Sequence, residues 1–228
     1  MPLRAGCGAS PSAQNWCNAD MNLADYLEPL PLVAVLRGIT PEETPAIADA
    51  LCAEGFRILE VPLNSPQPMQ SIERLARRYP QCLVGAGTVL AIEDVARVKS
   101  VGGKLIVMPH GDTRIVGEAK AHGLMCVPGV ATPTEAFAAL EAGADGLKMF
   151  PAEQLAPGAL KAWRAVLPKG TLVFPVGGMR PDNLAPWWQA GASGFGTGSN
   201  LYQPGAAPDE VRAIAAAFAE TFRALRAR

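Results

Sequence analysis

One repeat constrains the fold of this chain more than any other feature: a short apolar run, a turn, and an amphipathic stretch rich in alanine, leucine and charged residues. Each unit takes roughly 20 to 30 residues, the length of one strand, one helix and their connections. Glycine ends most of the helical stretches, where a left-handed cap is expected. The pattern predicts strands at 32–37, 57–63, 82–87, 104–109, 124–129, 145–150, 171–176 and 193–198. Helices are predicted to begin near Pro41, Pro66, Ala91, Asp112, Thr132, Glu153, Arg180 and Pro208, with Thr40, Ser65 and Thr132 as candidate N-caps.

Strands that are apolar along their whole length and alternate with helices predict a parallel sheet covered by helices. Eight such units in about 200 residues fit a closed (βα)8 barrel, the TIM barrel, as a single domain. A doubly wound open sheet is the alternative, but no GxGxxG nucleotide fingerprint follows the first predicted strand. Residues 1–22 are rich in Gly, Ser, Pro and Asn and lack apolar periodicity. We therefore expect a flexible N-terminal extension at 1–22 and a barrel domain at 23–228.

Charge and cysteine usage exclude several classes of function. The 20 basic and 21 acidic residues give a formal net charge of −1 without a Lys/Arg-rich run, which argues against nucleic acid as a partner. The five cysteines are scattered without a CxxC pair, so we expect reduced thiols and no metal site. No apolar stretch is long enough for a membrane span, and the first residues lack the apolar core of a signal peptide. We expect a cytoplasmic protein.

A lysine and a glutamate lie inside two of the apolar runs. Lys148, in the run 145–150, would be costly to bury as an ammonium, and burial lowers the pKa of a lysine toward neutrality. A neutral amine can attack a ketone and form a Schiff base, an electron sink for breaking an adjacent carbon–carbon bond. Glu60, in the run 57–63, needs a cationic partner or serves as a tuned acid/base. Each residue alone could equally be structural, and strand parity, which the sequence leaves open, decides whether both face inward.

Further candidates follow the predicted strands, at the end of a barrel where active sites form. Arg37 closes the first predicted strand, and Thr88 follows the third. Glycine-rich turns follow the seventh and the eighth, at 175–183 and 194–202. Their backbone N–H groups could approach a phosphate, with Ser199 as a hydroxyl donor, although a Gly-Gly pair can also be only a tight turn.

Six segments carry a family pattern in register: VLRGIT (35–40), LEVPLNSP (59–66), GAGTVL (85–90), ATPTEAFAALEAGADGLKMFPAE (131–153), VGGMRPDNL (176–184) and GTGSNLY (196–202). In this order they resemble the bacterial class I pyruvate aldolases, which cleave 2-keto-3-deoxy-6-phospho sugar acids. The resemblance covers nearly everything from Leu30 to Tyr202. It implies a (βα)8 barrel, often a homotrimer, that acts on a phosphorylated keto sugar acid without a metal or an organic cofactor.

The resemblance also implies roles by position. Lys148 takes the place of the Schiff-base lysine, and Glu60 takes that of the acid/base glutamate. Arg37 and Thr88 match residues that bind the carboxylate and carbonyl end of the keto acid. The matching phosphate-binding residues are Gly177, Gly178, Gly198 and Ser199.

Three positions bear on substrate choice within the family. Members for the gluconate-derived substrate tend to read LRT after the strand of the glutamate and TGG after the seventh strand. This chain reads LNSP and VGG, so Asn64, Ser65 and Val176 resemble the galactonate type. The expected reaction is cleavage of 2-dehydro-3-deoxy-6-phosphogalactonate to pyruvate and D-glyceraldehyde 3-phosphate, in galactonate catabolism. His110 departs from the family pattern and could alter substrate fit or proton transfer, although a lone histidine beside a turn is more often a surface residue.

Other functions stay open at this point. The substrate could be the gluconate-derived C4 epimer of the Entner–Doudoroff route, or both epimers. A phosphosugar isomerase or epimerase on the same barrel would need acid/base residues but no buried lysine. A non-catalytic phosphosugar-binding regulator is less favoured, because nothing resembling a DNA-binding or partner domain is attached.

Overall fold

A computed structural model describes residues 21–227 of the chain. Nearly all of the predicted flexible extension, 1–22, lies outside the described residues, so the division at residue 22 stays a prediction. The described chain begins at Met21, and Asn22 caps the first helical turn by accepting hydrogen bonds from two backbone N–H groups. None of the helices within residues 21–227 combines the length and the apolar character that crossing a bilayer requires.

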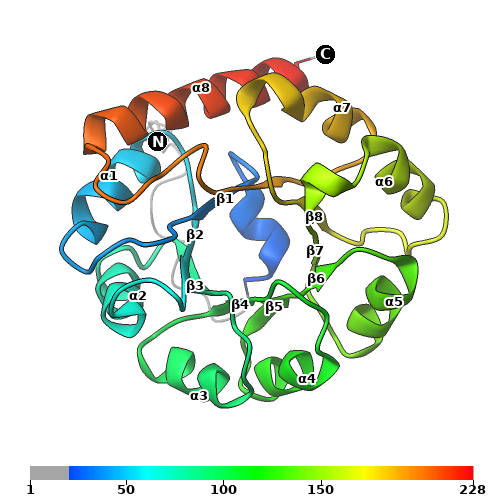
Figure 1. The fold of residues 1–228 in the computed structure, drawn as a ribbon, viewed down its shortest axis with the longest axis horizontal. Coiled ribbons are helices and arrows are strands. Elements are labelled where there is room, and N and C mark those ends of the chain that lie inside the picture. The colour runs from blue at the N-terminus through cyan, green and yellow to red at the C-terminus, as the bar shows by residue number, and fades with distance from the viewer. Residues whose placement is uncertain (1–20, 228) are drawn as a thin grey trace, which may run out of the picture.

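The strands form a curled parallel sheet at the centre of the molecule (Figure 1). They are β1 (Leu32–Val35), β2 (Ile58–Pro62), β3 (Leu83–Gly87), β4 (Leu105–Val107), β5 (Met125–Val127), β6 (Gly129–Val130), β7 (Leu147–Met149), β8 (Val173–Pro175) and β9 (Phe195–Thr197). Six strands are ordered β5-β4-β3-β2-β1-β9 and three are ordered β6-β7-β8, every pair being parallel. This order lacks the reversal of a doubly wound sheet. The predicted alternation of parallel strands and helices is confirmed.

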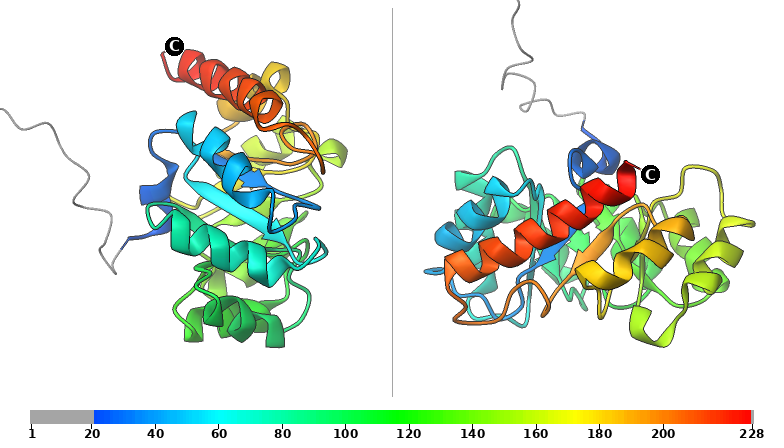
Figure 2. Two further views of the ribbon diagram at one scale, coloured as in Figure 1. Left: turned by 90° about the vertical axis from the view of Figure 1, so that its left-hand side faces the viewer. Right: turned by 90° about the horizontal axis from the view of Figure 1, so that it is seen from above.

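Helices surround the strands on the outside of the curl (Figure 1). They are α1 (Thr44–Ala53), α2 (Pro68–Arg78), α3 (Glu93–Ser100), α4 (Thr113–Ala121), α5 (Pro133–Glu141), α6 (Pro157–Arg164), α7 (Leu184–Gln189) and α8 (Pro208–Arg226), with 3-10 turns η1 (Leu23–Leu27), η2 (Ala152–Gln154) and η3 (Pro181–Asn183). The long α8 packs against α1 and lies across the outer face (Figure 2). Thus the C-terminal helix packs against the first helix of the repeat.

Two of the three predicted N-caps are wrong. Thr132 caps α5 in a reciprocal capping box with Glu135, as its spacing predicts. The N-caps of α1 and α2 are instead Glu43 and Gln67, and neither makes a capping hydrogen bond with its side chain. Thr40 donates its N–H and hydroxyl to the Glu43 carboxylate. The predicted capping hydroxyl of Ser65 accepts a hydrogen bond from another strand end, described below.

The fifth predicted strand, 124–129, is two strands. Its first part, β5, pairs with β4, while its second part, β6, pairs with β7. Pro128 separates them because proline has no N–H to donate to a sheet. Its carbonyl oxygen still accepts a hydrogen bond from the backbone N–H of Lys148, at 2.9 Å. The break therefore lies directly beside the strand that carries the lysine.

The side chains of the strands divide between two cores. Those on the convex face, such as Leu59 and Leu147, pack with the helices in a large outer core. Those on the concave face form a smaller inner core. Successive strand residues alternate between these faces, so Glu60 shares the inner face with Ile58. The members of the inner core are Leu23, Tyr26, Leu27, Ile58, Leu83, Leu105, Val107, Val127 and Phe174.

The turn η1 closes the N-terminal end of the curled sheet, a feature that the sequence pattern did not predict. In Figure 1 it lies at the centre of the ring of strands (blue), and Figure 2 shows it at one end of them. Its buried residues pack against the first residues of β2, β3 and β4, since Ile58, Leu83 and Leu105 belong to the same cluster. The inner core thus has an apolar floor.

Candidate active site

Glu60 is a buried carboxyl group on the concave face. Its residue is only 2 % exposed, in the centre of β2, and its Oε1 has no hydrogen-bond partner among the described residues. Burial raises the pKa of Glu60 above its ordinary value of 4.5, while the positive charges of Lys148 and Arg37 act in the opposite direction. A carboxyl group with a raised pKa can hold a proton and give it up again, which is the requirement for acid/base chemistry.

Gly87 makes room for this carboxyl group. It ends β3, the strand that pairs with β2. A β-carbon at this position would clash with Glu60 Oε1 and would lie 2.7 Å from Glu60 Cγ. The absence of a side chain at residue 87 is therefore a condition for the observed position of Glu60.

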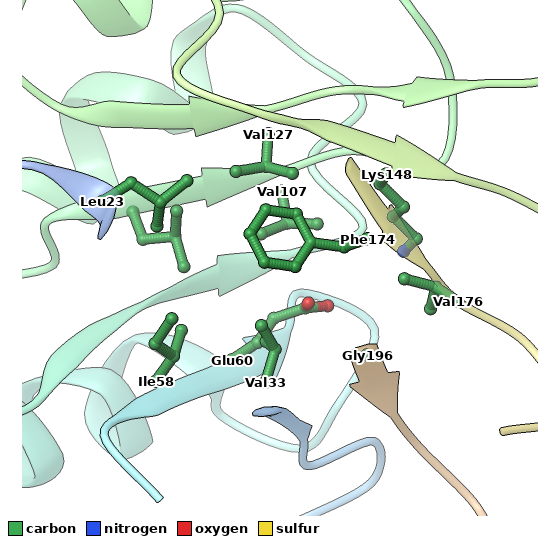
Figure 3. A pocket seen from close by; sticks show the side chains of 11 residues that line it. Leu23, Val33, Ile58, Glu60, Val107, Val127, Lys148, Phe174, Val176 and Gly196 are labelled. Carbon is green, nitrogen blue, oxygen red and sulfur yellow. The ribbon is translucent and has the colours of Figure 1, made fainter. Parts of the chain in front are cut away.

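Lys148 projects from β7 into the same interior. Its residue is 5 % exposed, and its Nζ lies over the ring of Phe150, 4.8 Å from the centroid. Figure 3 shows the Lys148 and Glu60 side chains extending into one cavity from different strands. Strand parity, left open by the sequence, therefore puts the amine and the carboxyl group on the same face.

Two cavities meet at Lys148. The first, called the inner cavity, has a volume of about 20 Å³, enough for about one water molecule. Glu60 and Lys148 are its only charged lining residues within the described chain, and the rest of its wall is apolar. It is lined by Leu23, Val33, Ile58, Glu60, Leu105, Val107, Val127, Lys148, Phe174, Val176 and Gly196 (Figure 3).

The second, called the mouth cavity, has a volume of about 460 Å³, the size of a small-molecule site. It lies beyond the carboxyl ends of the strands and shares Lys148 and Val176 with the inner cavity. Among the predicted site residues, those that line it are Arg37, Lys148, Val176, Gly177, Gly178, Gly198 and Ser199. The lysine, the guanidinium group and the two glycine-rich turns thus converge on one space.

Three other predicted residues do not line the mouth cavity but contact the segment that follows β1. Arg37 donates Nη1 to Asn64 Oδ1 at 2.8 Å and Nη2 to Thr88 Oγ1 at 3.4 Å. The next residue, Gly38, donates its N–H to Ser65 Oγ at 2.9 Å. Asn64, Ser65 and Thr88 therefore hold the Arg37–Gly38 segment, and a carboxylate bound by the guanidinium would depend on them.

The two glycine-rich turns lie side by side. Gly177 and Gly178 have φ angles of 109° and 65°, a region that favours glycine. Val176 and Gly196 form a parallel bridge, which joins the chain segments before the two turns. Across the turns, Asn200 Nδ2 donates to the carbonyl of Met179 at 3.1 Å. This arrangement brings backbone groups of both turns to the mouth cavity.

The sequence reading missed two residues of the site. Gly87 belongs to the segment GAGTVL (85–90), but only the clash that a β-carbon there would make with Glu60 distinguishes it from other strand glycines. Glu153, in the segment ending PAE, lines the mouth cavity. His110 is exposed and is not among the described residues that line either cavity. Within residues 21–227, no group of three or more His, Cys, Asp or Glu side chains is arranged to hold a metal ion.

Known proteins are similar to this chain in sequence and in fold. Residues 23–216 match the family model of the KDPG and KHG aldolases. The chain is 47% identical over 195 residues to 2-dehydro-3-deoxy-6-phosphogalactonate aldolase of Escherichia coli K12, covering 85% of this chain and 95% of that protein. It is 33% identical over 155 residues to the KHG/KDPG aldolase of the same organism, covering 67% and 72%.

A solved structure of native KDPGal superposes with a TM-score of 0.86 at 45% identity and covers 88% of this chain and 98% of that chain. The match to the family model, residues 23–216, spans the strands, Glu60, Lys148 and the glycine-rich turns. The resemblance read from the six sequence segments is therefore confirmed, and the chain belongs to the KDPG and KHG aldolase family.

Proposed function

We propose that this protein is a Schiff-base aldolase that cleaves 2-dehydro-3-deoxy-6-phosphogalactonate to pyruvate and D-glyceraldehyde 3-phosphate. One observation carries the proposal: the buried amine of Lys148 lies where the inner cavity, which holds Glu60, meets the mouth cavity. A substrate in the mouth cavity can reach the amine with its ketone while Glu60 exchanges protons from the other side.

The chemistry follows from this arrangement. The amine of Lys148, once it has given up a proton, attacks C2, and the resulting carbinolamine loses water to give an iminium. Electrons flow to the iminium as the C3–C4 bond breaks and the C4 hydroxyl gives its proton to Glu60, directly or through one water in the inner cavity. Glyceraldehyde 3-phosphate leaves, the enamine is protonated at C3, and hydrolysis releases pyruvate. These reaction steps require no metal and no organic cofactor.

The two ends of the substrate are bound by different parts of the mouth cavity. The Arg37 guanidinium, oriented by Asn64 and Thr88, binds the carboxylate. The backbone of the turns at Gly177–Gly178 and Gly198–Ser199 binds the phosphate, because N–H groups of glycine-rich turns can approach an anion closely. These two contacts fix the C3–C4 bond over the lysine.

The galactonate-derived epimer is favoured over the gluconate-derived one. The galactonate-type relative is 47% identical to this chain, against 33% for the KHG/KDPG aldolase of the same organism. Val176 lines both cavities, where an apolar side chain cannot hydrogen-bond a substrate hydroxyl. We assign to Val176, with Asn64 and Ser65, the preference at C4, the latter two acting through Arg37 and Gly38.

Borohydride trapping tests the mechanism. Incubation with pyruvate and borohydride should add a stable adduct to Lys148, located by peptide mass spectrometry, and Lys148→Ala should abolish both the adduct and cleavage. Lys161→Ala, at an exposed position of α6, is the matched control and should retain both. An adduct on another lysine, or none, refutes the mechanism. Cleavage rates on the two C4 epimers test the substrate, and Val176→Thr should move the ratio toward the gluconate-derived epimer.

We also propose that the curled sheet closes into a (βα)8 barrel. The pairing of β9 with β1 and the bridge between Val176 and Gly196 support closure on one side. On the other side, only Pro128 separates β5 from β6. A homotrimer in the cytoplasm, with the barrel as a single domain at 23–228, completes the proposal. Light scattering of the purified chain tests the trimer.

A further inference from the structure

The side chain of Glu153 lies against the glycine-rich turn at Gly177–Gly178. A β-carbon on Gly177 would clash with Glu153 Oε2, and one on Gly178 would lie 2.7 Å from Glu153 Cγ. The neighbouring Ala152 N–H donates to the carbonyl of Val176 at 2.8 Å, which fixes η2 to the start of the same turn. Although Glu153 is exposed, its side chain therefore lies in the space that side chains at both glycines would occupy.

Glu153 also brings a negative charge to this place. It is the only carboxylate among the described residues that line the mouth cavity, where Arg37 and Lys148 are the cations. It takes part in none of the ion pairs found within residues 21–227. An anion held by the Gly177–Gly178 turn would meet this charge without a countercharge between them.

We propose that Glu153 is a positioning residue that also moderates the affinity of the glycine-rich turn for phosphate. Its carbon chain keeps the turn in the conformation that presents the backbone to the anion. Its charge repels the anion and so prevents the phosphorylated product from being held too tightly, since phosphate is bound alike in substrate and product and extra affinity would slow release. This inference rests on the proposed phosphate site.

Inorganic phosphate, used as a competitive inhibitor of aldol cleavage by the full-length protein, separates shape from charge. Glu153→Gln keeps the side-chain shape and removes the charge, so the inhibition constant should fall about threefold, the scale of one solvent-exposed charge interaction. Glu153→Ala removes both, and its inhibition constant should lie at least about threefold above that of Glu153→Gln, because loss of the packing loosens the turn. Gln154→Ala, an exposed neighbour in η2, should match the unsubstituted protein.

The outcomes test the phosphate site and the role of Glu153 separately. If phosphate does not inhibit the unsubstituted protein at all, the phosphate site itself is wrong and the inference falls with it. If phosphate inhibits but Glu153→Gln binds it no more tightly, or Glu153→Ala behaves like Glu153→Gln, the role of Glu153 alone is refuted. Borohydride trapping with pyruvate, which carries no phosphate, should be unchanged in both variants and shows that they are folded.

Two thiols that line neither of the two cavities lie close together. Cys52, partly buried in α1, and Cys82, buried just before β3, lie with their sulfur atoms 3.5 Å apart. Arg57 Nη1 donates to the carbonyl of Cys52 at 3.4 Å. The Cys82 thiol and the positive charge of Arg57 lower the pKa of Cys52, whereas the pKa of Cys82 is raised. Cys52 is also the more exposed of the two, so a solute reaches its sulfur first, and the Cys82 sulfur lies in contact with it.

We infer that Cys52 and Cys82 form a reversible disulfide on exposure to a peroxide. The Cys52 thiolate attacks a peroxide oxygen, the O–O bond breaks, and a sulfenic acid forms with loss of hydroxide, which takes up a proton to become water. The Cys82 sulfur then attacks the Cys52 sulfur, the S–O bond breaks and water leaves. Two thiols lose two electrons in total, and hydrogen peroxide is reduced to two waters.

Peptide mapping after hydrogen peroxide and iodoacetamide tests this inference. Tryptic peptides 38–57 and 79–97 should be joined through Cys52 and Cys82, and dithiothreitol should separate them. Cys82→Ser should instead leave a sulfenic acid on Cys52 that reacts with dimedone. Cys126 is the internal control, since it is buried away from this pair and should stay open to alkylation after unfolding. Recovery of Cys52 and Cys82 both alkylated after peroxide, or Cys52 joined to another cysteine, overturns it.

Discussion

Substitution of Gly87 by alanine tests whether the space beside β3 exists for the Glu60 carboxyl group. The added methyl group would clash with Oε1 and lie 2.7 Å from Cγ of a side chain that is 2 % exposed. Overpacking of this kind costs about 1–3 kcal/mol. Replacing glycine by alanine returns about 0.4–1 kcal/mol through the unfolded chain. We expect a net loss of about 1–2 kcal/mol in the free energy of unfolding, measured by urea denaturation.

A double-mutant cycle with Glu60→Ala gives the decisive measurement. Without the carboxyl group the new methyl group has room, so Gly87→Ala should cost little in that background, with a coupling of about 1–2 kcal/mol between the two positions. Cleavage by Gly87→Ala alone should fall about 10²- to 10⁴-fold, the usual contribution of acid/base catalysis, because the carboxyl group is displaced.

Gly117→Ala in α4 serves as the control for the cycle. Nothing lies within 4 Å of a β-carbon there, so this change should raise stability by about 0.5–1 kcal/mol equally in both backgrounds. If Gly87→Ala costs the same with and without the Glu60 carboxyl group, the clash is not the reason for glycine at this position and the reasoning is refuted.

Three further changes probe the site. Burial raises the pKa of Glu60 above 4.5 in the folded state, so the folded protein keeps a proton there that the unfolded chain has lost. The free energy of unfolding should therefore fall as pH rises from 4.5 through the raised pKa. Glu60→Gln should remove this fall in urea titrations across pH, and parallel curves for the two proteins would contradict the shift. Asn64→Ala deletes the oxygen that accepts a hydrogen bond from Arg37 at 2.8 Å, and it should raise KM about 2- to 12-fold with kcat nearly unchanged. Asn64→Asp keeps an acceptor at this position and should retain the contact. A loss confined to kcat would contradict a role of Asn64 in orienting Arg37. Leu23→Ala should lower the free energy of unfolding by about 2–4 kcal/mol, since Leu23 is 3% exposed in the inner core, and an unchanged urea midpoint would show that η1 does not close the sheet.

The sequence predicted the repeat well because each strand is apolar on both faces and each helix has its own periodicity. The failures have local causes. Pro128 marks the missing backbone donor in the sequence, but the strands with which the two parts of the run pair depend on the fold of the whole chain. The turn η1 escaped detection because five residues show no helical period, and its burial depends on strands far along the chain.

For the site, position at a strand end selected Arg37 and the two glycine-rich turns, and a charge inside an apolar run selected Lys148; all of them line the mouth cavity. Contacts between segments were not predictable. Whether Asn64 touches the substrate or another side chain depends on where Arg37 points, and the sequence contains no sign of their hydrogen bond. Glu153 was likewise invisible, because its importance lies in the space behind two glycines that follow it by more than 20 residues.

Leu23 closes the inner cavity at the N-terminal end of the strands. The inner cavity has an apolar wall at its base, and its described lining residues shared with the mouth cavity include Lys148 and Val176. When substrate fills the mouth cavity, the hydron that Glu60 takes from the C4 hydroxyl lies between this apolar base and the reacting carbon atoms. We therefore expect the same hydron to protonate the enamine at C3 in part, before it exchanges with bulk water.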